Sequence, residues 1–258
     1  MSGAPPPAKS IDLNADVGEG YADAELLPLV TSANVACGAH AGDAASMRAT
    51  LELAHALGVR SGAHPGFPDR SGFGRRITTR DPAAIAALVG EQITALLRIA
   101  AQLDAAVAHV KPHGALYMEA ARDETLSRLM VEALLKSSPE TLLFCMGVSK
   151  TCSIARDAGL PVVREFYADR DYDRSGSIVF ARRMRPLDPM EVADKCVRAC
   201  LDGKVRTVEG DDIDIAFESI CFHSDTPGAL AIGTTVRDQL LKSGLRIATA
   251  AEVVANAA

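Results

Sequence analysis

The sequence predicts an α/β fold made of one domain, a TIM-like (β/α) barrel with seven or eight strands. Short β-like runs alternate with longer helical runs nearly from end to end, which is typical of parallel strands joined by right-handed crossovers. No linker divides the 258 residues, and a single barrel often has about 250. An open doubly wound sheet is the alternative, but such a sheet usually carries a glycine-rich nucleotide loop. Neither G-x-G-x-x-G after the first strand nor a G-x-x-x-x-G-K loop followed by Ser or Thr is present.

Capping residues and apolar runs place the elements along the chain. Asp43 is a suitable N-cap, and Gly58 a suitable stop, for the first long helix. Asp81-Pro82 and Asp188-Pro189 each combine an N-cap with proline at the first helical position. In chain order we expect strands at Ser10–Asn14 and Ala33–Cys37, a helix over Asp43–Leu57, a strand at Val59–His64, a loop over Pro65–Arg76, a helix from Pro82 to about Leu103, a strand at Val107–His113, a helix over Glu124–Lys136, a strand at Thr141–Met146, a helix over Lys150–Ala158, a strand at Pro161–Phe166, a helix from Pro189 to about Asp202, strands near Val205–Val208 and at Ser219–His223, a helix over Thr226–Lys242 and a strand at Leu245–Ala248.

Composition and charge exclude several classes of protein. The 27 basic and 33 acidic residues are scattered along the chain and give a net charge of −6. Nucleic acids and anionic membrane surfaces both attract concentrated positive charge, so neither is an expected partner. No stretch approaches the roughly 20 unbroken apolar residues of a membrane-spanning helix.

The ends of the chain and the cysteines indicate the compartment. Residues 1–9 are rich in Pro and Ala and lack the features of a signal peptide, so we expect a disordered tail before a single domain over 10–258. The six cysteines form no Cys-x-x-Cys motif and are expected to be free thiols. A cytoplasmic protein is the expectation.

Polar side chains collect where the predicted strands end. The carboxyl ends of parallel barrel strands share one face, and that face carries the active site in barrel enzymes. The groups are Asp12, Asn14, Asp16 and Glu19; Asn34, His40 and Asp43; His64; Lys111 and His113; Glu165, Asp169 and Arg170; and His223 and Asp225.

Strand periodicity predicts which side chains point into the barrel. Asp12, Asn14 and Asp16 alternate with apolar residues along the first strand, and Lys111 and His113 do so along the fourth. Burying many ionisable groups is costly unless they pair, bind a ligand or reach water. We therefore expect an active-site cavity, with a structural ion-pair network as the alternative.

Histidines and basic residues differ in what their positions indicate. His55 lies in the middle of a predicted helix and is expected to be an exposed or half-buried helix residue, whereas His109 is expected to make a core hydrogen bond. Lys111 is expected to bind a substrate carboxylate or act as a base, unless it forms a salt bridge to Asp12 or Asp16. Four histidines follow strands and are expected to be functional: His40, His64, His113 and His223.

Seven segments strongly resemble the LamB/YcsF family, which is the A subunit of the bacterial ATP-dependent 5-oxoprolinase. The resemblance runs from about Ile11 to Ile247. The segments are Asp12–Gly20, Thr31–Asp43, Gly62–Asp69, Gly72–Arg76, His109–Tyr117, Phe166–Tyr172 and Ser219–His223. The resemblance implies a barrel related to the polysaccharide-deacetylase-like folds. It also implies a complex with B and C subunits, in which 5-oxo-L-proline is opened to L-glutamate at the expense of ATP.

That chemistry calls for a cation that binds the substrate carboxylate, a base that activates water and donors for the developing oxyanion. ATP is the expected cosubstrate, with Mg²⁺ as its possible companion, and the missing P-loop indicates a nucleotide site that is atypical or shared with another subunit. The residues expected for these roles are Lys111 or Arg76 as the cation, Asp12, Asp16 or Glu165 as the base, and His64, His113 or Asn14 as the donors, with Asn34, His40 and His223 as further substrate-binding residues.

Two other functions remain open from the sequence. A metal-dependent amide hydrolase, such as a carbohydrate deacetylase, would hold Zn²⁺ or a similar ion on Asp16 and two of His40, His64 and His113. A non-catalytic subunit would bind the small acid and pass it to a partner.

Overall fold

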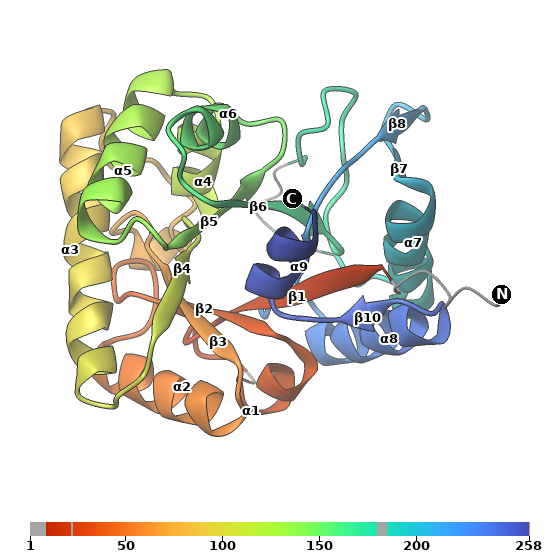
Figure 1. The fold of residues 1–258 in the computed structure, drawn as a ribbon, viewed down its shortest axis with the longest axis horizontal. Helices are drawn as coiled ribbons and strands as arrows, with labels where there is room; N and C mark the ends of the chain where they lie inside the picture. Colours follow the sequence, from red (N-terminus) through yellow and green to blue (C-terminus); the bar gives the residue numbers. More distant parts are fainter. Residues whose placement is uncertain (1–8, 22, 180–184, 258) are drawn as a thin grey trace, which may run out of the picture.

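Seven parallel strands close into a barrel in this computed structural model, which describes residues 9–21, 23–179 and 185–257. The strand order is β1-β2-β3-β4-β5-β6-β9, and β9 pairs with β1 to close the ring (Figure 1). The closing register places Asp12 opposite Ser219. The barrel strands are β1 (Ser10–Val17), β2 (Ser32–Ala36), β3 (Arg60–His64), β4 (Val107–Val110), β5 (Leu142–Met146), β6 (Val162–Tyr167) and β9 (Ser219–Phe222). The predicted barrel is thus confirmed, in its seven-stranded form.

Helices surround the barrel because the apolar side chains that alternate with polar ones along the strands point outward and must be covered. Ile11, Leu13 and Ala15 of β1 are buried in this outer layer. Figure 1 shows α2, α3 and α5 on one side and α7 and α8 on the other. The helices are α1 (Asp23–Leu26), α2 (Ala44–Ala56), α3 (Pro82–Ala101), α4 (Gly114–Ala120), α5 (Glu124–Ser137), α6 (Lys150–Asp157), α7 (Pro189–Asp202), α8 (Ala229–Lys242) and α9 (Ala250–Ala257), with short 3-10 turns at Leu27–Leu29 and Arg70–Gly72.

The predicted helix starts are confirmed by their hydrogen bonds. The Asp43 side chain accepts from the backbone N–H of Ser46 in a capping box, which satisfies one of the free donors at the start of α2. Asp81 accepts from the N–H of Ala83 at the start of α3, and Asp188 accepts from the N–H groups of Met190 and Glu191 at the start of α7, each with proline in the first turn. Gly58 follows α2 with a φ of 70°, a left-handed conformation that glycine adopts without strain.

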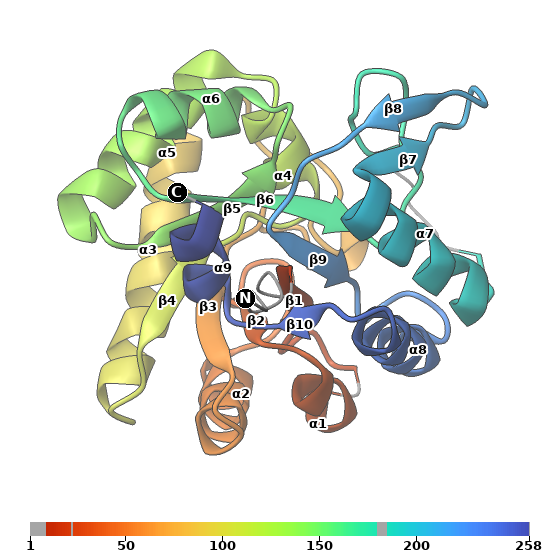
Figure 2. The same ribbon diagram turned by 45° about the vertical axis from the view of Figure 1, so that its right-hand side comes forward.

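Two strand predictions were wrong in detail. The predicted strand near Val205–Val208 lies outside the barrel, since β7 (Lys204–Arg206) pairs antiparallel with β8 (Asp212–Asp214) in a hairpin beside α7 (Figure 2). A period of two identifies a strand but not its partner. The strand predicted over Val107–His113 ends at Val110, and an extended segment continues it, with the N–H of Lys111 donating to the carbonyl of Ala63.

The carboxyl-terminal segments close the amino-terminal end of the barrel. The last strand, β10 (Arg246–Ile247), pairs only with the start of β1, outside the closed ring. The helix α9, which the sequence reasoning missed, packs Ala250 against Phe144 and Val163. Of the tail predicted to be disordered, residues 1–8 lie outside the described residues, while Lys9 donates to the carbonyl of Cys200.

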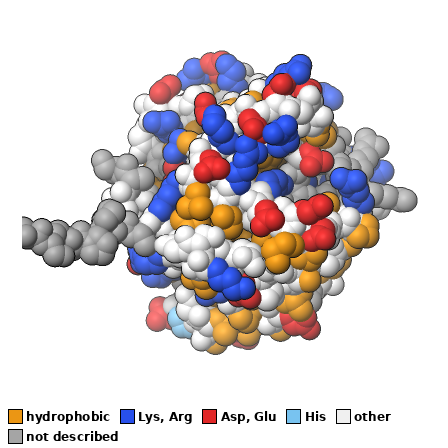
Figure 3. Space-filling view, turned by 90° about the vertical axis from the view of Figure 1, so that its right-hand side faces the viewer, with side chains coloured by type: hydrophobic (Ala, Val, Ile, Leu, Met, Phe, Trp, Pro, Cys, Tyr) orange, Lys and Arg blue, Asp and Glu red, His pale blue; other side chains and the backbone are white. Residues whose placement is uncertain are grey.

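The surface carries mixed charge. On the face that presents α7, α8 and the hairpin, Lys and Arg are interspersed with Asp and Glu (Figure 3). Ion pairs such as Arg198–Asp212 and Lys204–Asp214 neutralise these charges locally. All six cysteines are buried free thiols.

The helix α3 is long and apolar enough to cross a membrane by length and composition, with a mean hydropathy of 1.5. Core helices of soluble proteins pass the same test. Glu91 and Arg98 interrupt its apolar run, and one face, which includes Val89 and Leu96, is buried in the protein.

Gly62 of β3 generates a prediction about barrel packing, because a Cβ there would collide with the His109 ring. We expect Gly62→Ala to lower the free energy of unfolding by about 1–3 kcal/mol, the usual cost of overpacking a rigid core. Gly90→Ala on α3 is the matched control, since its Cβ would meet nothing within 4 Å. Urea unfolding should show that the control is unchanged or up to about 1 kcal/mol more stable. Equal stability of the two variants would contradict the close approach.

Candidate active site

The polar side chains of the strands fill the barrel interior in layers, as the strand periodicity predicted. Asp12 forms the floor and accepts hydrogen bonds from Thr31 Oγ1 and Ser32 Oγ, both at 2.7 Å, and from Ser219 Oγ. Burial raises the pKa of Asp12 to about 7, although these donors lower it. Asp12 is therefore a buried carboxyl that ionises near neutral pH.

Two asparagines connect the floor to the layer above. Asn14 Nδ2 donates to Ser219 Oγ at 2.7 Å and to Glu165 Oε1 at 3.3 Å. Asn34 Nδ2 donates to Asn14 Oδ1 at 2.8 Å and to Asp16 Oδ1 at 2.9 Å. Asn34 thereby orients the carboxylate of Asp16, which lies on the mouth side of this layer.

Lys111 crosses the barrel and is almost fully buried. Its Nζ lies 2.9 Å from Asp16 Oδ1 and 3.1 Å from Glu165 Oε1. Burial alone would lower the pKa of Lys111, but the neighbouring anionic groups, Asp16 foremost, raise it well above its usual range. Burial alone would raise the pKa of Asp16, but His64 and Lys111 hold it well below its usual range. Lys111 thus forms a salt bridge, which was the alternative expected for it from the sequence, and its acidic partners are Asp16 and Glu165.

Three imidazoles and a carboxyl group meet on one side of the mouth. Glu19 Oε1 lies 2.9 Å from His40 Nε2 and 3.4 Å from His113 Nδ1, and His113 Nδ1 lies 2.9 Å from His64 Nε2. Burial lowers the pKa of His40 to about 4. Burial and the charge of Asp16 raise the pKa of Glu19 to about 8. Imidazoles and a carboxyl group are the kinds of ligand that Zn²⁺ and similar ions accept.

His223 and Asp169 form a dyad on the other side of the mouth. His223 Nδ1 lies 2.9 Å from Asp169 Oδ1, and its Nε2 lies 3.8 Å from Asp16 Oδ2. Burial alone would raise the pKa of Asp169, but His223 and Arg170 hold it below its usual range. An ionised carboxylate on Nδ1 orients the ring and leaves Nε2 free to exchange a proton with a ligand.

A cavity of about 50 Å³ lies between these groups. Arg75 and Arg170 stand on its wall, and each is ion-paired, Arg75 with Asp225 and Arg170 with Asp169. The Tyr117 hydroxyl is buried and has no hydrogen-bond partner among the residues that the structure describes. The lining residues are Asp16, His64, Arg75, Lys111, Pro112, His113, Gly114, Tyr117, Met118, Tyr167, Arg170, Ile178 and His223.

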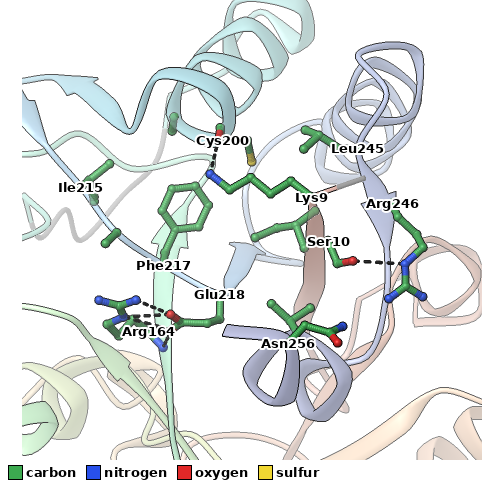
Figure 4. A pocket seen from close by; sticks show the side chains of 14 residues that line it. Lys9, Ser10, Arg164, Cys200, Ile215, Phe217, Glu218, Leu245, Arg246 and Asn256 are labelled. Carbon is green, nitrogen blue, oxygen red and sulfur yellow. Dashed lines mark hydrogen bonds and ion pairs between the residues drawn. The ribbon is translucent and has the colours of Figure 1, made fainter. Parts of the chain in front are cut away.

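A larger cavity of about 760 Å³ lies at the opposite, amino-terminal end of the barrel (Figure 4). Its charged side chains are engaged locally. Arg164 pairs with Glu218, and Lys9 donates to the carbonyl of Cys200, as the dashed lines show. The converging imidazoles and carboxylates therefore distinguish the small cavity as the candidate active site.

Most residues predicted for the site meet in the barrel. The structure brings together Asp12, Asn14, Asp16, Asn34, His40, His64, Lys111, His113, Glu165 and His223. Arg76 does not join them: its side chain is 57% exposed and binds Asp69. His109 makes the expected core hydrogen bond, to Asn34, and His55 is exposed on α2.

Sequence reasoning missed Glu19, Asp169 and Tyr117 as site residues. Glu19 and Asp169 were visible as polar residues after strands, but both lie in loops, where strand periodicity does not predict side-chain direction. Tyr117 ends the family-like segment His109–Tyr117, but it lies on the unpredicted helix α4, so strand periodicity did not mark it as a site residue.

The fold and site define a seven-stranded β/α barrel with a carboxylate and imidazole site at its carboxyl-terminal mouth. The chain belongs to the LamB/YcsF family, whose sequence pattern matches residues 11–255.

Named relatives align with nearly the whole chain. The Pseudomonas aeruginosa protein named as A subunit 1 of 5-oxoprolinase is 54% identical over 245 residues, which cover 92% of this chain and 97% of that protein. The Pyrococcus horikoshii protein named as the A subunit of 5-oxoprolinase is 36% identical, and the match covers 95% of this chain and 99% of that protein.

Solved structures confirm the fold. The lactam utilization protein of Thermus thermophilus superposes with a TM-score of 0.83 at 37% identity, covering 92% of this chain and 98% of that one. A T48 deacetylase superposes with a TM-score of 0.51 at 13% identity, covering 96% of this chain and 92% of that one. The second likeness confirms the predicted relation to deacetylase-like barrels at the level of the fold.

Asp12 generates a prediction about pH. Its pKa is about 7 in the folded protein against an ordinary 3.8, so the folded chain binds more protons between these values and loses stability as pH rises. We expect this group alone to lower the free energy of unfolding by about 2–3 kcal/mol between pH 5 and pH 8. In Asp12→Asn the fall should be smaller by that amount, as measured by urea unfolding at several pH values. Parallel pH profiles for the two proteins would contradict the raised pKa.

Lys111 generates a prediction about stability. Lys111→Met leaves Asp16 and Glu165 buried without their cation, so we expect the free energy of unfolding to fall by about 3–5 kcal/mol. Adding Asp16→Asn should restore part of the loss, because one unpaired charge is removed. Denaturant unfolding of the single and double variants measures both effects. A Lys111→Met protein as stable as the parent would show that the ion pairs contribute nothing.

Proposed function

We propose that this chain is the A subunit of an ATP-dependent 5-oxoprolinase, which opens the lactam ring of 5-oxo-L-proline to give L-glutamate. The carrying observation is that the acid and imidazole site lies in a chain 54% identical, almost end to end, to a protein named as A subunit 1 of 5-oxoprolinase. The expected partners are the B and C subunits, and the expected compartment is the cytoplasm. ATP is the cosubstrate of the complex, with Mg²⁺ as its counterion.

A five-membered lactam is a stable amide, so its opening at neutral pH is favourable when coupled to phosphate transfer. Transfer of the γ-phosphoryl group of ATP to the lactam oxygen, with loss of the ring N–H proton, activates the ring carbon and releases ADP. Water then adds to that carbon, the C–N bond breaks to give γ-glutamyl phosphate, and hydrolysis of this acyl phosphate releases phosphate and L-glutamate. The water addition needs a base for the water and a proton donor for the ring nitrogen, on which charge develops.

His223 has the geometry of the base. Asp169 holds its Nδ1, which leaves Nε2 to accept a proton from water in the cavity beside Asp16. Asp16 was expected as a base, but its pKa well below the usual range makes it a weak one. Asp16 suits another role better: its fixed negative charge stabilises the imidazolium that forms when His223 accepts the proton.

Tyr117 and two arginines supply the remaining groups. Tyr117 is one of the residues that line the cavity, and burial raises the pKa of its hydroxyl well above the usual range, so this group stays protonated and is a donor. Lys111 and Arg76 were expected to bind the substrate carboxylate, but both are committed to neighbouring carboxylates. Arg75 and Arg170 are also ion-paired, each with one aspartate, but both line the cavity, and we assign them the role of binding the substrate carboxylate in exchange for these partners.

Substrate entry requires the wall to move. The cavity of about 50 Å³ has room for one or two waters, and a cyclic acid needs more. A shift of the Arg75 side chain, which is 16% exposed, would enlarge the opening toward solvent.

The other two functions remain distinguishable. A metal-dependent amide hydrolase would act without ATP and lose activity in chelator, and it is favoured only by the imidazole cluster. A non-catalytic carrier would bind 5-oxoproline yet tolerate loss of the His223 imidazole.

The test reconstitutes this chain with the B and C subunits and measures ATP-dependent glutamate formation. We expect turnover in the mixture and little in the isolated chain. His223→Gln should lower turnover by about 10²–10⁴-fold while 5-oxoproline still binds in calorimetry, because the base acts in the chemical step. His55→Gln, on the exposed surface of α2, is the control and should match the parent.

Two outcomes would refute this assignment. Turnover by the isolated chain at the rate of the mixture would remove the need for partner subunits. Parent-like turnover in His223→Gln, with the variant folded by circular dichroism, would place the base on another residue or another subunit.

A further inference from the structure

We propose that Glu19, His64 and His113 bind one divalent transition-metal ion, with Zn²⁺ the best-suited probe. This site goes beyond the proposed function, since it depends on no particular substrate. It also differs from the ligand set expected from sequence, because Glu19 replaces Asp16 and His40 is not a ligand.

The rings of His64 and His113 each use one nitrogen in a hydrogen bond to a backbone carbonyl, which defines the other nitrogen as the one available to bind a metal ion. His64 Nδ1 lies 2.7 Å from the carbonyl oxygen of Lys111, and His113 Nε2 lies 2.9 Å from that of Phe73. A carbonyl oxygen only accepts, so each of these nitrogens carries its ring proton. His64 Nε2 and His113 Nδ1 are therefore left with lone pairs. Backbone carbonyls orient metal-binding histidines in this way in known sites.

The two lone pairs face each other across 2.9 Å. Because each ring carries a proton on its other nitrogen, these two nitrogens attract each other only if a cation, either a second proton or a metal ion, lies between them. Glu19 Oε1 completes a triangle with them, 3.4 Å from His113 Nδ1 and 3.9 Å from His64 Nε2. Ligands about 2.0–2.1 Å from a tetrahedral zinc ion lie roughly 3.3–3.4 Å from one another. A bridging proton satisfies two of these atoms, whereas one metal ion satisfies all three.

His40 is a positioning residue for Glu19. Its Nε2 lies 2.9 Å from Glu19 Oε1, and Ser224 donates to the other carboxylate oxygen at 3.2 Å. The His40 ring stacks on the His113 ring with centroids 3.7 Å apart and planes 3° from parallel. Imidazole binds a metal in the plane of its ring, so two rings stacked in this way cannot both bind one ion.

The remaining side of the triangle is open toward the cavity. Asp16 Oδ2 lies 3.4 Å from His64 Nε2, and Asp16, His64 and His113 all line the cavity. Three protein ligands with one free position is the arrangement of catalytic rather than structural zinc sites. The ion would be accessible to a small ligand in the cavity.

The experiment uses the full chain without a histidine tag, stripped with chelator and titrated with ZnCl₂ in calorimetry. We expect one equivalent to bind and the melting temperature to rise with Zn²⁺ concentration, a readout that needs no variant. CoCl₂ in place of Zn²⁺ should give visible absorption bands that respond to loss of a nitrogen ligand. Turnover is not part of the readout, so failure here leaves the proposed function standing.

Variants identify the ligands. Glu19→Gln keeps the shape of the side chain and should weaken Zn²⁺ binding by more than about 100-fold, as should His64→Asn and His113→Asn. His40→Asn should weaken it by about 10–100-fold, the usual effect of a residue that orients a ligand. His55→Asn should have no effect, because His55 is exposed on α2.

Two results would overturn the site. The first is a parent protein that neither binds Zn²⁺ in calorimetry nor gains thermal stability from it. The second is Zn²⁺ binding to folded Glu19→Gln and His64→Asn with the affinity of the parent, which would place the ion elsewhere on the chain.

Discussion

The buried charge of Lys111 is the constraint on which the barrel interior depends. An ammonium group without water must be neutralised at close range. Asp16 and Glu165, on β1 and β6, supply the negative charge, and Asn14 and Asn34 hold these carboxylates in place. The strands β1, β2 and β6 are thereby tied to the extended segment after β4. The same network keeps Asp16 ionised at the mouth, so the interaction that organises the interior also prepares the site.

The layers below and above Lys111 differ in charge for a physical reason. At the floor, hydroxyl donors surround Asp12, and burial without a cation leaves this carboxyl titrating near neutrality. At the mouth, His64 and Lys111 keep Asp16 ionised. The strand β1 therefore carries two inward-facing aspartates whose pKa values are shifted in opposite directions, upward for Asp12 and downward for Asp16.

Asp16 divides the mouth into two halves with different chemistry. The Asp169–His223 dyad on one side resembles the acid and imidazole pairs that move protons. The triangle of Glu19, His64 and His113 on the other side presents lone pairs and a carboxylate, which suits a cation. Both halves open into the same small cavity, so a ligand there would contact a proton acceptor and a cation site together.

The sequence by itself determined the barrel, the helix caps, the inward parity of Asp12, Asn14 and Asp16, and the strand ends that carry the site. These features are local, since capping and periodicity depend on residues a few positions apart. Only the tertiary structure decided which inward charges pair, because strands distant along the chain become neighbours when β9 closes onto β1. It also placed β7 in a hairpin outside the barrel, and it added Glu19 and Asp169 from loops whose side-chain directions no period describes. Pairing and ligand geometry depend on distances across the barrel, which the sequence does not contain.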